Sequence, residues 1–269
     1  EILTETNLES AIELAKEIEQ NNIDRKELDK TITHEALRQI EENDEQQKFS
    51  TVVYSETWHK GVIGIVASRL IETHYRPTLV FTMNGDKLAA SARSVKGYDV
   101  YNALEKCSEF VEQFGGHKYA AGLTLKPENY DGFKAKFEEV VRESMPEELR
   151  TPEVVINAEI ELSEITPKFF RILKQFAPFG PSNMRPVFMT NGLRDNGYGK
   201  QVGEDKSHLK LNIISGADKK TYNAIGFGLG DKLDSIERNA SFDAVFNIEE
   251  NHWNGNTSLQ LQLKDIKVE

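Results

Sequence analysis

Residues 51–70 read TVVYSETWHKGVIGIVASRL and place a short β-branched segment directly before a helical pattern. Thr51 to Tyr54 form a strand candidate, because β-branched and aromatic residues favour strands. The positions that follow at helical spacing are Val62, Ile65, Val66, Arg69 and Leu70. A strand that leads into a helix indicates an α/β domain.

The residues that follow extend this α/β pattern. Pro77 precedes a β-branched and aromatic run, Thr78–Thr82, and Asn84-Gly85 gives a hairpin signal into Leu88–Ser94. Helices predicted at Val100–Val111 and Tyr130–Ser144 complete the domain. We therefore predict a mixed α/β domain over residues 49–148.

The preceding residues, 1–48, predict a helical arm. Apolar stripes run over Leu8–Ile18 and Leu28–Ile40, and Asn21 and Asn22 separate them, which predicts two helices. These stripes hold too little apolar surface for a separate domain. The arm is expected to connect domains.

A proline-flanked acidic stretch, Met145–Pro152, predicts a domain boundary. Beyond it, one helix is expected near Pro167–Phe176. The expected strands are Val154–Ile160, Pro186–Thr190, His208–Ile214, Tyr222–Phe227, Phe242–Ile248 and Leu259–Ile266. Short strands with one helix suit a small barrel of the oligonucleotide-binding (OB) type over residues 149–269, and a sandwich stays open on pattern alone.

Composition limits the classes of function. No apolar run approaches the ~18 residues of a membrane span, so insertion in a membrane is not expected. The net charge of −11 opposes nucleic-acid binding, but residues 1–50 hold 14 acidic and 6 basic residues, a net −8 that leaves −3 for the other 219. A local basic groove is compatible with this distribution.

The single cysteine, Cys107, lies in an apolar pattern and predicts a core thiol in a reducing compartment.

The first motif that could carry chemistry is WHKGVIGIVASRL, residues 58–70. Gly61 and Gly64 allow close backbone approach at a helix start, where free amides attract anions. This favours a phosphate contact that involves His59. Equally, Trp58 and His59 could be packed residues that close the turn.

The second motif is LAASARS, residues 88–94. Ser91, Arg93 and Ser94 would place a guanidinium beside two hydroxyls, a set suited to a phosphodiester. An exposed strand with an ordinary surface arginine is the alternative.

The third motif is FGGHKYAAGLTL, residues 114–125. Gly115 and Gly116 free the backbone immediately before His117 and Lys118, where a charged ligand could reach them. A simple turn before a strand would have the same sequence pattern.

A complete reaction centre is missing from the pattern. The sequence has no phosphate-binding loop, nucleophile elbow, HExxH or paired CxxC motif, and no cluster of aspartate and histidine for two divalent metal ions. We therefore expect binding residues here, and neither catalytic nor metal-ligating ones.

The three motifs, in this order and spacing, resemble the DHHA1 domain of RecJ-type single-stranded-DNA-specific exonucleases of the DHH/DHHA1 superfamily. The arm with Asn22 and Arg25 resembles the family's connector helix. The likeness continues through FAPFGPSNMRPVF, SHLKLNI and ENHWNGNTSLQLQLKDI, at residues 176–188, 207–213 and 250–266. The chain thus resembles a carboxy-terminal fragment without the DHH domain.

The resemblance implies 5′-to-3′ hydrolysis of single-stranded DNA in repair and recombination by the full-length protein, which would be cytoplasmic. Mn or Mg would be held by the missing DHH domain, so none is expected in this chain, and the fragment alone is expected to be inactive. Single-strand-binding protein is a candidate partner. The implied DNA-binding residues are His59, Ser91, Arg93, Ser94, Gly115, Gly116, His117 and Lys118, with Arg25, Lys210 and Trp253 as weaker candidates.

Two alternatives remain open at this point. A related DHH/DHHA1 phosphodiesterase would act on short oligoribonucleotides or cyclic dinucleotides, although such relatives generally do not continue into an OB domain. A DNA-binding scaffold without catalysis would use the same fold.

Overall fold

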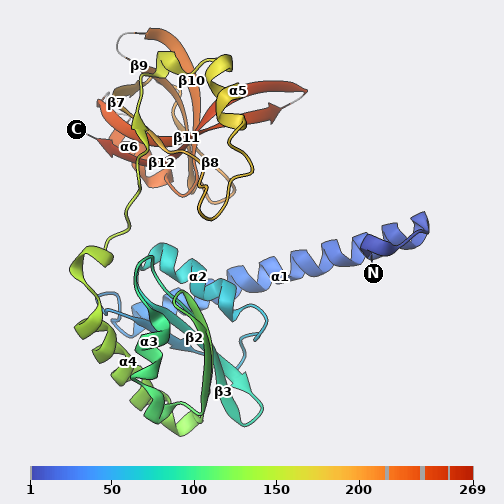
Figure 1. Cartoon of the computed structure of the whole chain (residues 1–269), viewed down its shortest axis with the longest axis vertical. Coiled ribbons are helices and arrows are strands. Elements are labelled where there is room, and N and C mark those ends of the chain that lie inside the picture. The colour runs from blue at the N-terminus through green and yellow to red at the C-terminus, as the bar shows by residue number, and fades with distance from the viewer. Residues whose placement is uncertain (1, 216–217, 237–239, 254, 269) are drawn as a thin grey trace. The chain divides into compact units, whose positions relative to one another are not determined.

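The computed structural model describes residues 2–215, 218–236, 240–253 and 255–268, without the side chains of residues 218, 219 and 253. The chain divides into two compact units, Glu1–Pro152 and Glu153–Glu269, which are coloured blue to green and green to red in Figure 1. Each unit has its own hydrophobic core. None of the helices in the described part of the chain is both long and apolar enough to cross a membrane.

The first unit begins with one continuous helix, α1 (Leu8–Glu42), capped by the side chain of Asn7. The predicted break at Asn21 and Asn22 is wrong: Asn22 accepts a hydrogen bond of 2.8 Å from Arg25 one turn further on. Asparagine lowers helix propensity only modestly, so the long helix tolerates it. The buried residues of α1 all lie between Asp29 and Ile40. This half of the helix carries the side chains that pack into the core of the unit.

A five-stranded mixed sheet forms the centre of the first unit, in the order β1-β2-β3-β5-β4. Its strands are β1 (Thr51–Tyr54), β2 (Thr78–Asn84), β3 (Lys87–Arg93), β4 (Gln113–His117) and β5 (Ala120–Leu125). Pair β1–β2 is parallel and the other pairs are antiparallel. The predicted mixed sheet is present, and the glycine-rich third motif forms its last hairpin.

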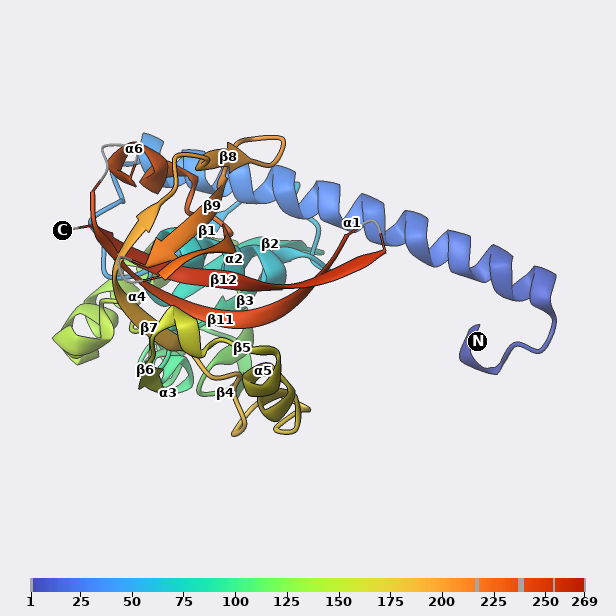
Figure 2. The ribbon, with the colours of Figure 1, turned by 90° about the horizontal axis from the view of Figure 1, so that it is seen from above.

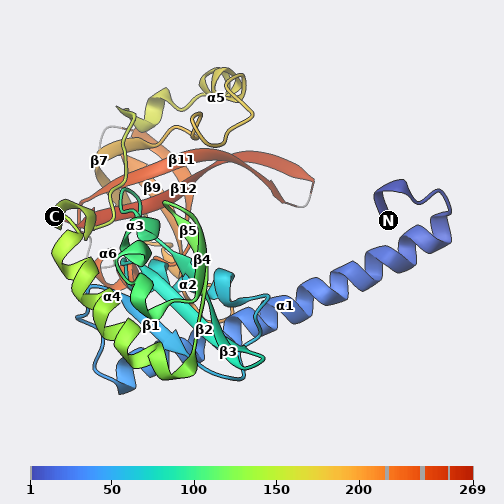
Figure 3. The ribbon, with the colours of Figure 1, turned by 60° about the horizontal axis from the view of Figure 1, so that its bottom comes forward.

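Helices cover both faces of this sheet. On one face, α1 and α2 (Ile63–Thr73) bury Val53 and Val80. On the other, α3 (Val100–Glu105) and α4 (Tyr130–Ser144) cover the side chains of alternate positions such as Leu79 and Phe81. Figure 3 shows α3 and α4 on one side of the sheet and α2 on the other. The helix predicted to reach Val111 ends at Glu105, and a short 3₁₀ turn follows.

The segment between α1 and β1 is fixed by two buried charged side chains. The carboxylate of Glu138 on α4 accepts hydrogen bonds from the backbone N–H groups of Phe49 and Ser50, at 3.0 and 2.9 Å, and from the Ser50 hydroxyl at 2.6 Å. The Arg76 guanidinium donates to the carbonyls of Glu45, Gln46 and Lys48. These bonds satisfy backbone groups that would otherwise be buried without partners.

The second unit is a barrel of the OB type. Its strands are β6 (Ala158–Glu159), β7 (Phe188–Asp195), β8 (Lys200–Val202), β9 (His208–Ser215), β10 (Asp218–Gly226), β11 (Phe242–Trp253) and β12 (Asn256–Val268). The order is β6-β7-β11-β12-β10-β9-β8, and a further β7–β9 pairing closes a ring of five strands. The barrel prediction is confirmed in its OB form.

Two helices and one long hairpin complete this unit. Helix α5 (Pro167–Lys174) packs Phe169, Phe170 and Leu173 on the barrel core. The short helix α6 (Leu233–Ile236) follows β10 and precedes β11 in the chain. Figure 2 shows β11 and β12 as a long curved hairpin. Of the strand predicted at Val154–Ile160 only Ala158 and Glu159 pair, with β7. Val155, in the unpaired part of the predicted strand, is 60% exposed. The high β propensity of its residues was not enough to form a strand there, because they have no partner strand.

Replacement of Glu138 by glutamine should destabilise the first unit by about 2 kcal/mol, because an amide nitrogen would face N–H donors that now meet a carboxylate. Urea denaturation followed by circular dichroism measures the change. Glu139→Gln, which alters an exposed partner of Lys136 on the same helix, should leave stability nearly unchanged. Equal stability of the two variants would contradict the anchoring role of Glu138.

Candidate functional site

The three sequence motifs meet on one face of the first unit's sheet. The strand register aligns Val53, Val80, Ser91, Gly122 and Gly115 in one rung across all five strands. Residues directly opposite one another in neighbouring strands point to the same face. Val53 and Val80 are buried under α1 and α2, whereas Gly122 and Gly115 are exposed. The rung therefore runs from a helix-covered core to an open surface.

The next rung carries the charged candidates. Thr78, Arg93, Ala120 and His117 are aligned across β2, β3, β5 and β4. Neighbouring strands lie about 4.8 Å apart, so roughly 10 Å separates the backbones at Arg93 and His117, with only a methyl group between them. Ser91, Arg93, Gly115 and His117 are thus brought together at one end of the sheet.

A shallow groove of about 350 Å³ lies over these small residues. Its lining residues are Lys60, Ala89, Ala90, Gln113, Phe114, Gly115, Gly122, Leu123 and Thr124. Lys60 brings the first motif to the groove, and none of the described lining side chains is acidic. The groove therefore offers positive charge and open backbone to a ligand.

Arg93 is half-buried and held in place. Its guanidinium donates to the Ser91 hydroxyl at 3.1 Å and to the Ala92 carbonyl at 2.8 Å. Gly64, in the first turn of α2, leaves it room, since a Cβ there would lie 2.8 Å from Arg93 Nη2 and 3.0 Å from Ser91 Oγ. Among the described residues Arg93 forms no ion pair. A guanidinium beside a helix start without a carboxylate partner favours an anion.

Two histidines have the same local geometry. His59 Nδ1 accepts from the Gly61 N–H at 3.1 Å, and His117 Nδ1 accepts from the Tyr119 N–H at 3.3 Å. Both side chains are exposed. Because Nδ1 accepts, the neutral ring carries its proton on Nε2. Each histidine therefore presents an N–H donor on the outer side of its ring.

Two further predicted residues, Ser94 and Lys118, lie close by in the chain but are engaged locally. The Ser94 hydroxyl donates to the Tyr98 carbonyl at 3.0 Å. The Lys118 ammonium lies 5.4 Å from the centre of the Tyr119 ring and is exposed. Trp58 is buried, and its indole N–H donates to Glu35 at 2.8 Å, so it is a packed residue.

Arg25 is not among the residues that line this groove, and Lys210 and Trp253 belong to the second unit. Arg25 is exposed on α1, where it donates to Asn22. Lys210 is exposed on β9 of the second unit. Trp253 ends β11, and its side chain lies outside the described residues. Their contact with nucleic acid stays a prediction.

Sequence reasoning missed Lys60, Ala120 and Gly122. Lys60 follows His59 directly, and its reach into the groove depends on the turn before α2. Ala120 and Gly122 alternate with the core residues Ala121 and Leu123, a period-2 pattern that could have indicated a strand with one bare face.

The described residues do not fit a divalent metal site. No three side chains of His, Cys, Asp or Glu gather within the described ranges in a way that could hold an ion. Cys107 is fully buried, and this burial raises the pKa of its thiol to about 12. The thiol therefore stays protonated near neutral pH, and the structure supports its prediction as a core residue.

Two family models match the chain in the same order as its two units. A DHHA1 domain model matches residues 46–143 and a RecJ OB domain model matches residues 156–265. The chain is thus a protein of the class that joins a DHHA1 domain to an OB domain. Curated relatives extend the match: the single-stranded-DNA-specific exonucleases RecJ of Bacillus subtilis and Escherichia coli are each 30% identical, over 99% and 97% of this chain.

A solved structure agrees with these relatives. RecJ from Thermus thermophilus in complex with Mn²⁺ superposes with a TM-score of 0.79 and 25% identity, over 98% of this chain and 37% of that one. The chain belongs to the RecJ family. It spans 34% of the Bacillus subtilis relative's length and 46% of the Escherichia coli relative's.

Gly116→Ala should destabilise the first unit by at least about 2 kcal/mol, since Gly116 has φ +148° and a Cβ would lie 2.4 Å from the Ala120 carbonyl oxygen. Gly115→Ala is the matched control, because a Cβ there meets nothing within 4 Å. Urea denaturation of both variants checks the difference. Equal losses would show that the backbone of β4 relaxes at either position.

Proposed function

We propose that this chain binds and positions single-stranded DNA for a 5′-to-3′ exonuclease. The observation that carries the proposal is the convergence of Ser91, Arg93, Gly115 and His117 beside a groove without acidic lining. The RecJ OB match over residues 156–265 favours this function over that of a phosphodiesterase of short oligoribonucleotides or cyclic dinucleotides, and over that of a non-catalytic scaffold.

In this proposal the first unit holds the phosphates of the strand. Arg93 would donate two N–H groups to one phosphate, and Ser91 already fixes the orientation of that guanidinium. Lys60 would add a second positive charge, while His59 and His117 would donate from Nε2. Binding in a fixed orientation lowers the entropic cost of the reaction.

The chemistry of cleavage is proposed to reside in the full-length protein. RecJ from Thermus thermophilus has been solved in complex with Mn²⁺ and with Mg²⁺, and such an ion in a DHH domain would activate the attacking water. The residues of this chain would bind and orient the strand, and the chain alone would be inactive.

The second unit would extend the grip on the strand. Lys200 and Lys210 face each other across the β8–β9 ladder, and both are exposed. Phe227 is 58% exposed, and its ring centre lies 5.1 Å from that of His208. Lysines beside an exposed aromatic ring can bind phosphates and stack a base.

We further propose a cytoplasmic role in DNA repair and recombination, with single-strand-binding protein as a candidate partner. The family membership supports this role. Co-purification of the full-length protein with single-strand-binding protein tests the partnership, and absence of the complex would contradict it. A normal repair phenotype after deletion of the gene would contradict the repair role.

Arg93→Ala should lower the affinity for 5′-phosphorylated single-stranded DNA at least about tenfold, because a charge-assisted contact is worth roughly 1.5–3 kcal/mol and about 1.4 kcal/mol corresponds to tenfold. The slope of log affinity against log salt should fall by about 0.7, the change expected for one lost phosphate contact. Fluorescence anisotropy over a salt series measures both. The control is Arg142→Ala on α4, at the opposite face of the sheet. It makes the same change of charge and should leave the affinity and the salt slope nearly unchanged.

His117→Gln should retain more DNA affinity than His117→Asn. The glutamine amide nitrogen lies near the position of Nε2, the proposed donor, whereas the asparagine amide matches Nδ1. Anisotropy titrations of the two variants give the ratio of their DNA affinities, and thermal melts show whether both variants fold. A better rescue by asparagine would assign the contact to Nδ1 and contradict the proposed donor.

A further inference from the structure

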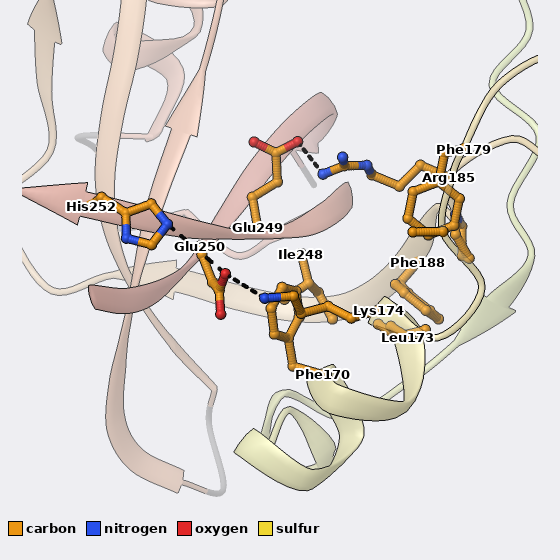
Figure 4. Close-up of a pocket in the computed structure, with 12 residues that line it drawn as sticks. Phe170, Leu173, Lys174, Phe179, Arg185, Phe188, Ile248, Glu249, Glu250 and His252 are labelled. Atoms are coloured by element: carbon orange, nitrogen blue, oxygen red, sulfur yellow. Dashed lines mark hydrogen bonds and ion pairs between the residues drawn. The ribbon is translucent and has the colours of Figure 1, made fainter.

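The motif FAPFGPSNMRPVF builds a second recessed site, within the OB unit. A pocket of about 380 Å³ lies between α5, the segment 177–188 and strand β11. Figure 4 shows Phe170, Phe179 and Phe188 on one side of this pocket and Glu249, Glu250 and His252 of β11 on the other. In the ring of barrel strands β11 and β9 lie on opposite sides of β7. The pocket is therefore separate from the lysine-bearing surface of β8 and β9.

The segment that carries Phe179 and Arg185 is tied together by side chains. The Asn183 amide donates to the carbonyls of Phe176 and Pro178, at 2.8 and 2.9 Å, and its backbone exchanges two hydrogen bonds of 2.9 Å with Gly180. The Asn247 amide of β11 donates to the Pro186 carbonyl at 2.6 Å. This loop is fixed before any ligand arrives, which lowers the entropic cost of binding.

Each cation of the pocket contacts both a carboxylate and an aromatic ring. Arg185 lies 2.6 Å from Glu249 and 5.3 Å from the centre of the Phe179 ring. Lys174 lies 2.9 Å from Glu250 and 5.7 Å from the centre of the Phe170 ring. These side chains are partly exposed, so a ligand can reach them. The pocket thus combines aromatic walls with fixed hydrogen-bond donors and acceptors.

We propose that this pocket takes a single nucleobase of the bound strand. A base has flat apolar faces for Phe170 and Phe179, and its edge carries donors and acceptors that match Arg185 and the two glutamates. An aliphatic or aromatic side chain of a partner protein would also fill the walls, but it would add no hydrogen bonds to these polar groups, whereas the edge of a base can. The inference rests on the proposed function, since it assumes a bound strand.

The test compares Phe179→Leu with Phe176→Leu in the 269-residue chain. Phe179 lines the pocket, whereas Phe176 lies on the same loop outside the lining and is 59% exposed. The probes are a fluorescein-labelled dT oligonucleotide for anisotropy over a salt series, and a 5-iodouracil-substituted oligonucleotide for photocrosslinking and mass spectrometry. Thermal melts establish that both variants fold.

Phe179→Leu should weaken binding roughly tenfold, within the range for losing one stacked base, without changing the salt slope, because no phosphate contact is lost. Phe176→Leu should bind like wild type. Crosslinks should fall on Phe170 or Phe179. Arg185→Gln should also weaken binding while retaining the aromatic wall.

Equal affinities of Phe179→Leu and Phe176→Leu, with strong binding by wild type, would overturn the base pocket while the proposed function stands. A protein side chain would then be the occupant that the apolar walls fit. No binding by folded wild type would overturn the strand-binding proposal for this chain, and with it the base pocket.

Discussion

The hydrogen-bond register of β3, β5 and β4 is the constraint on which the candidate interface depends. It places Ser91 beside Gly122 and Gly115, and Arg93 beside Ala120 and His117. A slip of one residue would turn Arg93 toward α3 and α4 and would place Ala92 at the surface. Gly116 on β4 also fixes the register, because its backbone lies so close to Ala120 and Ala121 of β5 that a side chain at this position would not fit.

Local electrostatics matter more at this face than the net charge of −11. Much of the negative charge lies in residues 1–50, and several of those carboxylates are engaged: Asp29 with Arg69 at 2.7 Å, and Glu45 with Lys134 at 2.7 Å. Arg93 has no such partner among the described residues. Salt screens exposed charges over about 10 Å, so distant carboxylates weaken an anion site far less than one in contact would.

The sequence predicted those features that local patterns determine. The strand before Trp58, the Asn84-Gly85 hairpin and the OB barrel all depend on short-range periodicity and turn chemistry. The Gly115-Gly116 pair was harder to place, since paired glycines weaken strands and resemble a turn, and only pairing with β5 makes them a strand. Lys60 reaches the groove through tertiary packing. The pocket beside α5 also depends on tertiary structure, because it joins α5 to the distant strand β11.

The bare face of β5 also determines what the groove could distinguish. The methyl group of Ala120, the backbone at Gly122 and the cations Lys60 and Arg93 offer no pattern that would separate one base from another, because every nucleotide presents them the same phosphate and sugar. On the proposed function, a strand could therefore advance through the first unit by one nucleotide at a time and meet equivalent contacts at each position. Such indifference to sequence is what stepwise degradation of an arbitrary strand requires.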